Sequence, residues 1–111
     1  MKITQRHVQD VVILDIDGQI MGGPDSEVFQ QTIQSLVAAG KSKVVVNLKS
    51  VNWMNSTGLG VLISGFSLLD KGGGKMRLLH VSERIASLLE ITKLSSIFQS
   101  YDDEAAAVGS F

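Results

Sequence analysis

The chain has 111 residues, of which 44% are hydrophobic and 19% are charged, so it can bury a core and is not a disordered tail. Its formal net charge is −1 and its aromatic content is 5%, which exclude the basic surface and the stacking platform typical of nucleic-acid binding. The absence of cysteine excludes disulfides and thiol chemistry.

The first part of the chain predicts two strands and then a helix. Residues 3–8 alternate weakly as a strand, and residues 11–17, VVILDID, form a β-branched run of the same kind. Pro24 suits the first position of a helix, and Gly40 is placed to end it. The apolar residues of this helix share one face, made by Phe29, Ile33, Leu36 and Val37.

The rest of the chain predicts an alternation of strands and helices. Residues 43–48, KVVVNL, form a nearly continuous apolar run, as in a central strand covered on both faces. Residues 56–70 have apolar side chains at helical spacing. The remaining elements are a strand at residues 75–81, a helix at 82–94 capped by Ser82, a short strand at 96–101 and a helical turn at 102–108.

This order, β-β-α-β-α-β-α-β-α, predicts a single α/β domain over residues 1–111. Strands that alternate with helices favour a mixed, mostly parallel sheet of about five strands, with the first two strands antiparallel or at an edge. We expect the helices mainly on one face of the sheet.

One uncharged segment, residues 50–69, is about as long as a bilayer span. Its first half contains the polar residues Asn52, Asn55, Ser56 and Thr57, so the apolar part is too short to cross a membrane. We therefore predict a buried segment and no membrane insertion. The N-terminal sequence lacks the apolar core of a secretory signal, so we expect a cytoplasmic protein.

The stretch NSTGLG, residues 55–60, places three short polar side chains directly before a helix. One of the three is expected to cap the free amides of the helix start, which is worth about 1 kcal/mol. Gly58 and Gly60 each cost about 1 kcal/mol relative to alanine in a helix, but they leave amides accessible and let another surface approach. The pattern predicts an exposed hydroxyl at the positive end of a helix, where an anion is stabilised.

The glycine clusters do not match known nucleotide-binding loops. The pattern G-x-G-x-x-G fails because Ile63 stands where the third glycine belongs, and GGGKM at residues 72–76 does not supply a phosphate loop. We therefore predict no cofactor.

No catalytic or metal-binding set follows from the spacing of the ionisable residues. His7 and His80 lie on separate predicted strands, and no nucleophile–histidine arrangement is evident. Asp15 and Asp17 share a strand face and could hold a cation, but a pair of solvated carboxylates is the simpler interpretation, and the calcium-loop pattern is not met. We predict no catalytic residue and no metal ligand.

The run from Lys43 to about Leu69 resembles the central signature of the STAS domain, in particular that of bacterial anti-sigma-factor antagonists. The S-T-G-L-G core at residues 56–60 carries most of this resemblance. More loosely, VVILDIDGQI resembles the early strand of that family, and residues 75–108 resemble its closing strand, helix and strand.

The resemblance implies that Ser56 matches the serine that a partner kinase phosphorylates in that family. Two positions depart from the family pattern: Asn55 stands where the antagonists usually have aspartate, and Met21 stands where many carry an acid. Both departures bear on how a kinase would recognise the serine. The partner-binding surface implied by the resemblance comprises Asn55, Ser56, Thr57, Gly58, Leu59 and Gly60.

The resemblance implies an anti-sigma-factor antagonist that is not an enzyme. Its expected partner is an anti-sigma factor with serine kinase activity, a histidine-kinase-like ATPase, in a partner switch that controls transcription. Two other roles remain open: a STAS accessory subunit of a lipid ABC transporter or of a stress-signalling assembly, and a small-molecule or nucleotide-binding sensor. The sequence leaves the oligomeric state open.

Overall fold

The computed structural model describes residues 1–111, and its elements follow the predicted order. The strands are β1 (Lys2–Val8), β2 (Val11–Ile20), β3 (Lys43–Met54), β4 (Lys75–Leu79) and β5 (Gln99–Tyr101). The helices are α1 (Pro24–Ala38), α2 (Ser56–Lys71), α3 (Glu83–Ile91) and α4 (Glu104–Val108).

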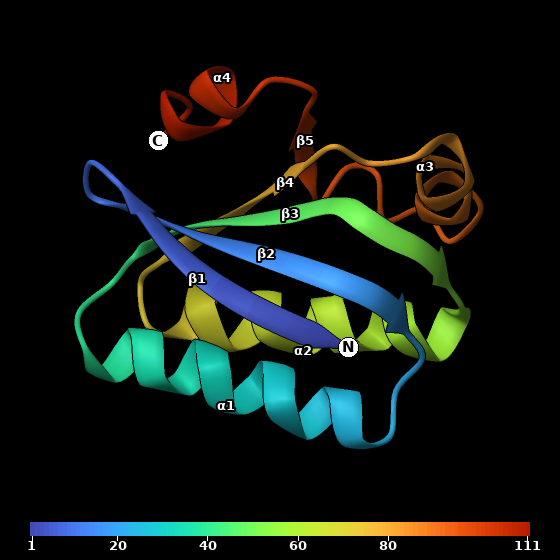
Figure 1. Ribbon diagram of the computed structural model, residues 1–111, viewed down its shortest axis with the longest axis horizontal. Coiled ribbons are helices and arrows are strands. Elements are labelled where there is room, and N and C mark those ends of the chain that lie inside the picture. The colour runs from blue at the N-terminus through green and yellow to red at the C-terminus, as the bar shows by residue number, and fades with distance from the viewer.

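The strands form one five-stranded sheet in the order β1-β2-β3-β4-β5. β1 pairs with β2 antiparallel, whereas the other three pairs are parallel, so the predicted mixed and mostly parallel sheet is confirmed. The carboxyl ends of β2 and β3 lie at the same edge, where α2 begins (Figure 1). This arrangement brings the loops after both strands to the start of α2.

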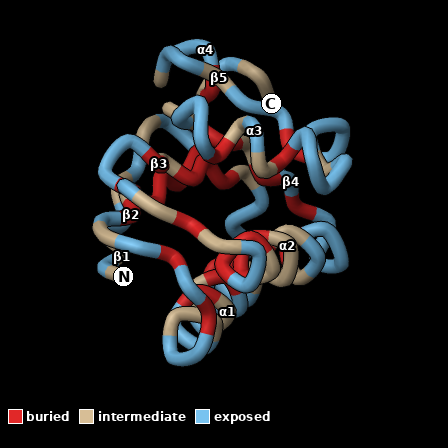
Figure 2. The backbone as a smooth tube through the Cα atoms, turned by 90° about the vertical axis from the view of Figure 1, so that its right-hand side faces the viewer, coloured by how far each residue is buried: buried red, intermediate tan, exposed pale blue.

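Helices α1 and α2 cover one face of the sheet, and most of the buried chain lies between these two layers (Figures 1 and 2). The inward positions of β2 and β3 are apolar and almost completely buried, as Leu14 and Val46 illustrate. The short helix α4 packs on the other face, where Ala107 contacts a second, smaller cluster that includes Val45. The prediction that helices lie mainly on one face is therefore confirmed.

Both central strands are longer than the sequence predicts, whereas β4, α3, β5 and α4 are shorter. β2 and β3 continue past their apolar runs because two register shifts keep them paired up to Ile20 and Met54. β4 stops at Leu79 because the next residue, His80, adopts a positive φ of 56°. The end of α3 at Ile91 is followed by a second residue with positive φ, Lys93, whose φ is 61°. The extension of β3 matters for function because it carries the chain directly to Asn55.

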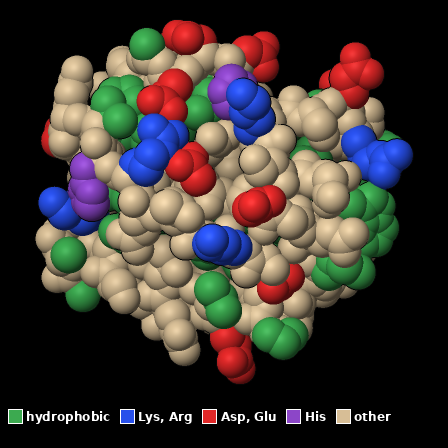
Figure 3. All heavy atoms as spheres, viewed as in Figure 1, with side chains coloured by type: hydrophobic (Ala, Val, Ile, Leu, Met, Phe, Trp, Pro, Cys, Tyr) green, Lys and Arg blue, Asp and Glu red, His purple; other side chains and the backbone are tan.

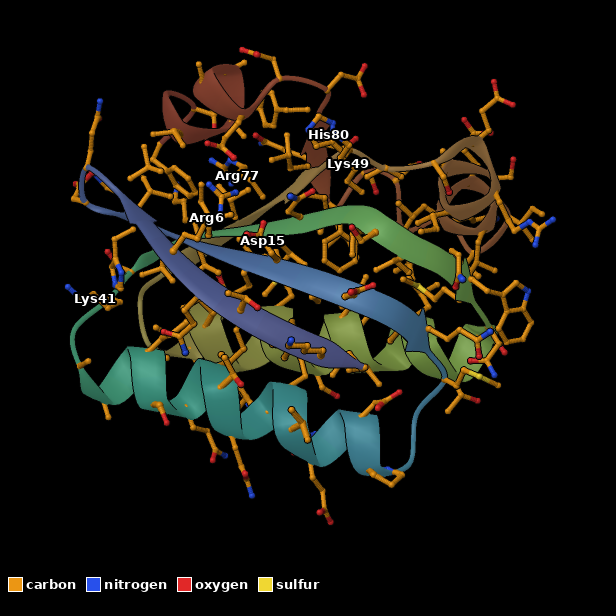
Figure 4. All side chains as sticks on the ribbon, in the orientation of Figure 1. Arg6, Asp15, Lys41, Lys49, Arg77 and His80 are labelled. Atoms are coloured by element: carbon orange, nitrogen blue, oxygen red, sulfur yellow. The ribbon has the colours of Figure 1, made fainter.

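A small polar network joins the β1–β2 hairpin to α4 on the less covered face of the sheet. The guanidinium of Arg6 donates to both carboxylate oxygens of Asp15, with Nη2–Oδ1 at 3.0 Å, and to Glu104 at 2.7 Å. Asn47 donates to the same Asp15 at 2.8 Å. Figure 4 shows Arg6 and Asp15 together on this face. Asp15 is thus held by protein donors.

These contacts make the stability of the domain depend on pH. The hydrogen bond from Arg6 is the main cause that holds the pKa of Asp15 below its ordinary value of 3.8. Partial desolvation acts in the opposite direction and raises this pKa, whereas the hydrogen bond from Asn47 lowers it further. A carboxylate with a lowered folded-state pKa stabilises the fold above pH 3.8, and this contribution is lost as pH falls through the folded-state pKa.

Replacing Asp15 by asparagine is therefore expected to lower the unfolding free energy at pH 7 by about 1 kcal/mol and to reduce the loss of stability between pH 7 and pH 2.5. Urea denaturation at both pH values measures this. Asp17→Asn, at an exposed position of the same strand and outside the ion pairs of the structure, is the control and should change the unfolding free energy at pH 7 by no more than about 0.5 kcal/mol. An equal loss of stability on acidification in the wild type and Asp15→Asn would contradict the expectation.

No helix of the structure has the length and apolar character needed to cross a membrane.

Candidate functional site

The start of α2 is organised by one polar side chain, that of Asn55. This residue follows the last residue of β3 in an extended conformation, and its Oδ1 accepts a hydrogen bond from the Gly58 amide at 2.7 Å. Its backbone carbonyl accepts the first helical bond, from Leu59 at 2.9 Å. The prediction that one of the three polar residues caps the helix is confirmed, and Asn55 is that residue.

Ser56 and Thr57, the first two residues of α2, are both exposed. The Gly58 amide donates to the Asn55 cap. The amides of Ser56 and Thr57 have no acceptor within the helix, because no helical turn precedes them. The first turn of α2 contains no acidic side chain, so the positive end of its dipole is not neutralised locally. The Ser56 hydroxyl thus lies on the surface at a point that favours negative charge.

Gly58 is required by packing inside the domain. It is buried, and a Cβ built on it would lie 1.8 Å from the carbonyl oxygen of Ile20 at the end of β2. The same Cβ would lie 3.1 Å from Cγ of Met54. The expectation that Gly58 lets another molecule approach is therefore wrong for this residue, because its missing side chain makes room for β2 instead.

Gly60 has the opposite environment. It is partly exposed, and a Cβ built on it would meet no atom within 4 Å. Alanine would be favoured by about 1 kcal/mol in such a helical position. Nothing inside the domain accounts for the glycine, so a small residue at this position is consistent with close approach by another surface.

The loop between β2 and α1 forms the second side of the site. Gly22 is buried with a φ of 91°, and a Cβ on it would lie 2.4 Å from Cγ2 of Thr57. The preceding Met21 is 43% exposed, and its amide donates to Oδ2 of Asp25 at 3.4 Å. The spacing along the chain does not indicate the contact between Gly22 and Thr57, since 35 positions separate the two residues.

The predicted partner-binding set therefore divides into two groups. Asn55, Ser56, Thr57 and Gly60 are at least partly exposed, whereas Gly58 is buried and Leu59 is only 2% exposed. The Leu59 side chain belongs to the main core. In this structure the surface at the start of α2, which we call the α2 rim, comprises Met21, Asn55, Ser56, Thr57 and Gly60.

The two histidines singled out in the sequence do not lie on neighbouring strands. His7 lies on β1 and His80 directly after β4, with β2 and β3 between those strands in the sheet. No three metal-ligating side chains lie close enough to hold an ion. Acidic and basic side chains are interspersed on the face seen in Figure 3. The α2 rim is thus the candidate site, because the polar residues that the sequence singles out at positions 55–57 are at least partly exposed there.

Comparison with known proteins gives a consistent result. The family model for the STAS domain matches residues 2–107. The anti-sigma-B factor antagonist of Bacillus subtilis is 36% identical over 86 residues, which are 75% of this chain and 78% of the relative.

Two solved structures have the same fold. A Thermotoga maritima protein proposed to be an anti-sigma factor antagonist superposes with a TM-score of 0.86 at 24% identity, covering 97% of this chain and 92% of that one. The phosphorylated form of the Bacillus cell fate determinant SpoIIAA superposes with a TM-score of 0.73 at 16% identity, covering 99% of this chain and 100% of that one. At these identities the likeness shows the fold.

Proposed function

Because this chain belongs to the STAS domain family, we propose that it is an anti-sigma-factor antagonist whose binding is switched by phosphorylation of Ser56. The observation that carries the proposal is the exposed Ser56 hydroxyl at the first position of α2, beside amides that the Asn55 cap leaves free. The Bacillus subtilis relative is an antagonist of an anti-sigma-B factor, which favours this role over a transporter subunit or a small-molecule sensor.

In the unmodified state, the α2 rim offers a partner an uncharged surface. Its side chains are short or absent at positions 55–60, apart from the inward-facing Leu59, and Met21 adds exposed apolar area at its edge. An anti-sigma factor docks on this surface and releases its sigma factor. The protein is a binding partner in this scheme and performs no catalysis.

Phosphorylation of Ser56 adds a charge of roughly −1.5 to −2. At the first position of a helix this charge is compatible with the fold, because it lies at the positive end of the dipole. In a packed interface the same charge has to lose its water, which weakens the complex. The switch therefore acts on the interface and leaves the domain folded.

Asn55 has a specific consequence for this switch. Its side-chain oxygen is committed to the Gly58 amide and carries no formal charge. A phosphate on the neighbouring Ser56 therefore meets no carboxylate at the cap position. We propose that the kinase recognises the serine without help from an acid at position 55. The anti-sigma factor itself supplies this serine kinase activity. Both proteins act in the cytoplasm.

To test the phosphorylation site directly, the protein is incubated with ATP and with the anti-sigma factor from the same organism. The protein is then digested, and its peptides are analysed by mass spectrometry. The wild type should gain one phosphate, mapped by fragmentation to Ser56, and Ser56→Ala should gain none. Thr57→Ala is the matched control and should be modified like the wild type. Modification that persists in Ser56→Ala and disappears in Thr57→Ala would assign the site to Thr57 instead.

A further inference from the structure

A group of cationic side chains lies at the opposite end of β3 from the α2 rim. Lys43 and Lys75 are the first residues of the parallel strands β3 and β4 and are paired in register. Arg77 follows Lys75 by two residues, so both side chains point to the same face of the sheet. Like charges on neighbouring strands repel each other, so this grouping is unfavourable by itself. A basic composition does not explain it either, because the formal net charge of the whole chain is −1.

Only one of these three charges has an acidic partner within the protein. Lys43 Nζ lies 2.6 Å from Oδ2 of Asp10, whereas neither Lys75 nor Arg77 is among the side chains in the ion pairs of the structure. Two positive charges at this end of the sheet are therefore left without a counter-charge.

Arg77 is held in place by neutral groups. It is partly buried, its Nε donates to Oγ of Ser110 at 3.2 Å, and its guanidinium carbon lies 4.9 Å from the centre of the Phe111 ring. A guanidinium carries five N–H donors, so most of this fork remains available to a ligand. Figure 4 shows Arg77 on the side of the sheet that α4 covers.

These groups line a cavity of about 230 Å³. Its wall contains no acidic side chain and combines the three cations with hydroxyls and one aromatic ring. Positive charge in a concave site raises the local concentration of anions. The side chains that line it are those of Ser42, Lys43, Lys75, Arg77, Ser110 and Phe111.

We propose that this cavity binds a phosphate group, either as inorganic phosphate or as the phosphate of a monoester. The planar Arg77 fork suits two oxygens of one phosphate, Lys75 supplies a second charge, and the Ser42 hydroxyl is a further donor. The volume of about 230 Å³ lies below the range of roughly 300–1,000 Å³ typical of pockets for drug-sized ligands, so the site suits a small group rather than a whole nucleotide.

This site is distinct from the α2 rim and does not depend on the proposed function. The two lie at opposite ends of β3, whose 12 residues extend along most of a molecule with a longest dimension of 32 Å.

Titration of the ¹⁵N-labelled protein with inorganic phosphate, at an ionic strength held constant with NaCl, tests the proposal by NMR. We expect saturable shifts of the amides at residues 42–43, 75–77 and 110–111. Lys75→Gln should weaken binding about fivefold and Arg77→Gln at least tenfold. Arg84→Gln removes an exposed charge on α3 and should bind like the wild type.

Parallel titrations with glycerol 3-phosphate and with phosphatidylcholine vesicles containing phosphatidic acid distinguish the sources of the phosphate group. Binding to either that weakens in Lys75→Gln supports the site and identifies the source. Because Lys75 is exposed, this variant keeps the test valid if Arg77→Gln does not fold. Shifts that do not saturate with any of the three probes, or wild-type affinity in both cavity variants, would overturn the proposal.

Discussion

Replacing Gly58 by alanine is expected to destabilise the domain by about 3 kcal/mol, a large fraction of the stability of a small domain. The new methyl group would lie 1.8 Å from the Ile20 carbonyl oxygen, so either α2 or the end of β2 has to move. The clash involves backbone, which cannot give way as a flexible side chain would. Thermal and urea unfolding followed by circular dichroism measures the effect, with an expected drop in Tm of more than about 10 °C.

Gly60→Ala is the matched control for this change, since it makes the same substitution two positions later in the same helix. No atom lies within 4 Å of the added Cβ, so the variant should be more stable than the wild type by about 0.5–1 kcal/mol. If a partner packs against the α2 rim, the same methyl group should weaken its binding about tenfold. Equal destabilisation by the two substitutions would contradict the packing described for α2.

Replacing Ser56 by aspartate is expected to weaken binding of the anti-sigma factor about a hundredfold, which corresponds to a penalty of about 3 kcal/mol. The carboxylate places a charge on the α2 rim, where the first turn of the helix has no acidic side chain in the wild type, and a charge there has to lose its water in the proposed interface. An acid at the first position of a helix is favourable by about 0.3–1 kcal/mol, so the Tm should stay the same or rise. Isothermal titration calorimetry with the anti-sigma factor and thermal unfolding of the free protein measure the two effects separately.

Ser67→Asp is the control for this substitution because Ser67 is an exposed serine of the same helix, outside its first turn. It should bind like the wild type. A Ser56→Asp protein whose weaker binding is accompanied by a large fall in Tm would indicate a folding defect and would remove this support for the switch.

Much of the fold could be predicted because local patterns determine it. The apolar periodicity of residues 56–70 and the β-branched runs at residues 11–17 and 43–48 appear as α2, β2 and β3. Short polar residues before a helix indicate a cap, and Asn55 provides it. These signals lie within a few residues of the structure that they specify.

Other features could not be predicted because they depend on residues far apart in the chain. Gly58 and Gly60 look equivalent in sequence, yet only the position of Ile20, brought alongside by β2, makes the first glycine indispensable. Arg6 meets Glu104 across 98 positions, which places α4 on the face opposite α1 and α2. Pairing beyond the apolar runs of β2 and β3 likewise depends on two register shifts that local propensity does not encode.

The candidate site combines both kinds of information. The row Asn55-Ser56-Thr57 indicates a helix start with spare hydrogen-bonding capacity, but the sequence does not say which of the three caps the helix. The geometry assigns the cap to Asn55 and leaves the hydroxyl of Ser56 on the surface. It also removes Leu59 from the accessible set, because that side chain is part of the core.

The most direct test of the switch is a time course in which the complex of this protein with its anti-sigma factor is incubated with ATP and followed by native mass spectrometry. Phosphate on Ser56 and the fraction of intact complex are measured in the same samples. We expect the complex to disappear in proportion to Ser56 phosphorylation, while the released protein stays folded. A complex that persists at full occupancy with Ser56 phosphorylated would contradict it.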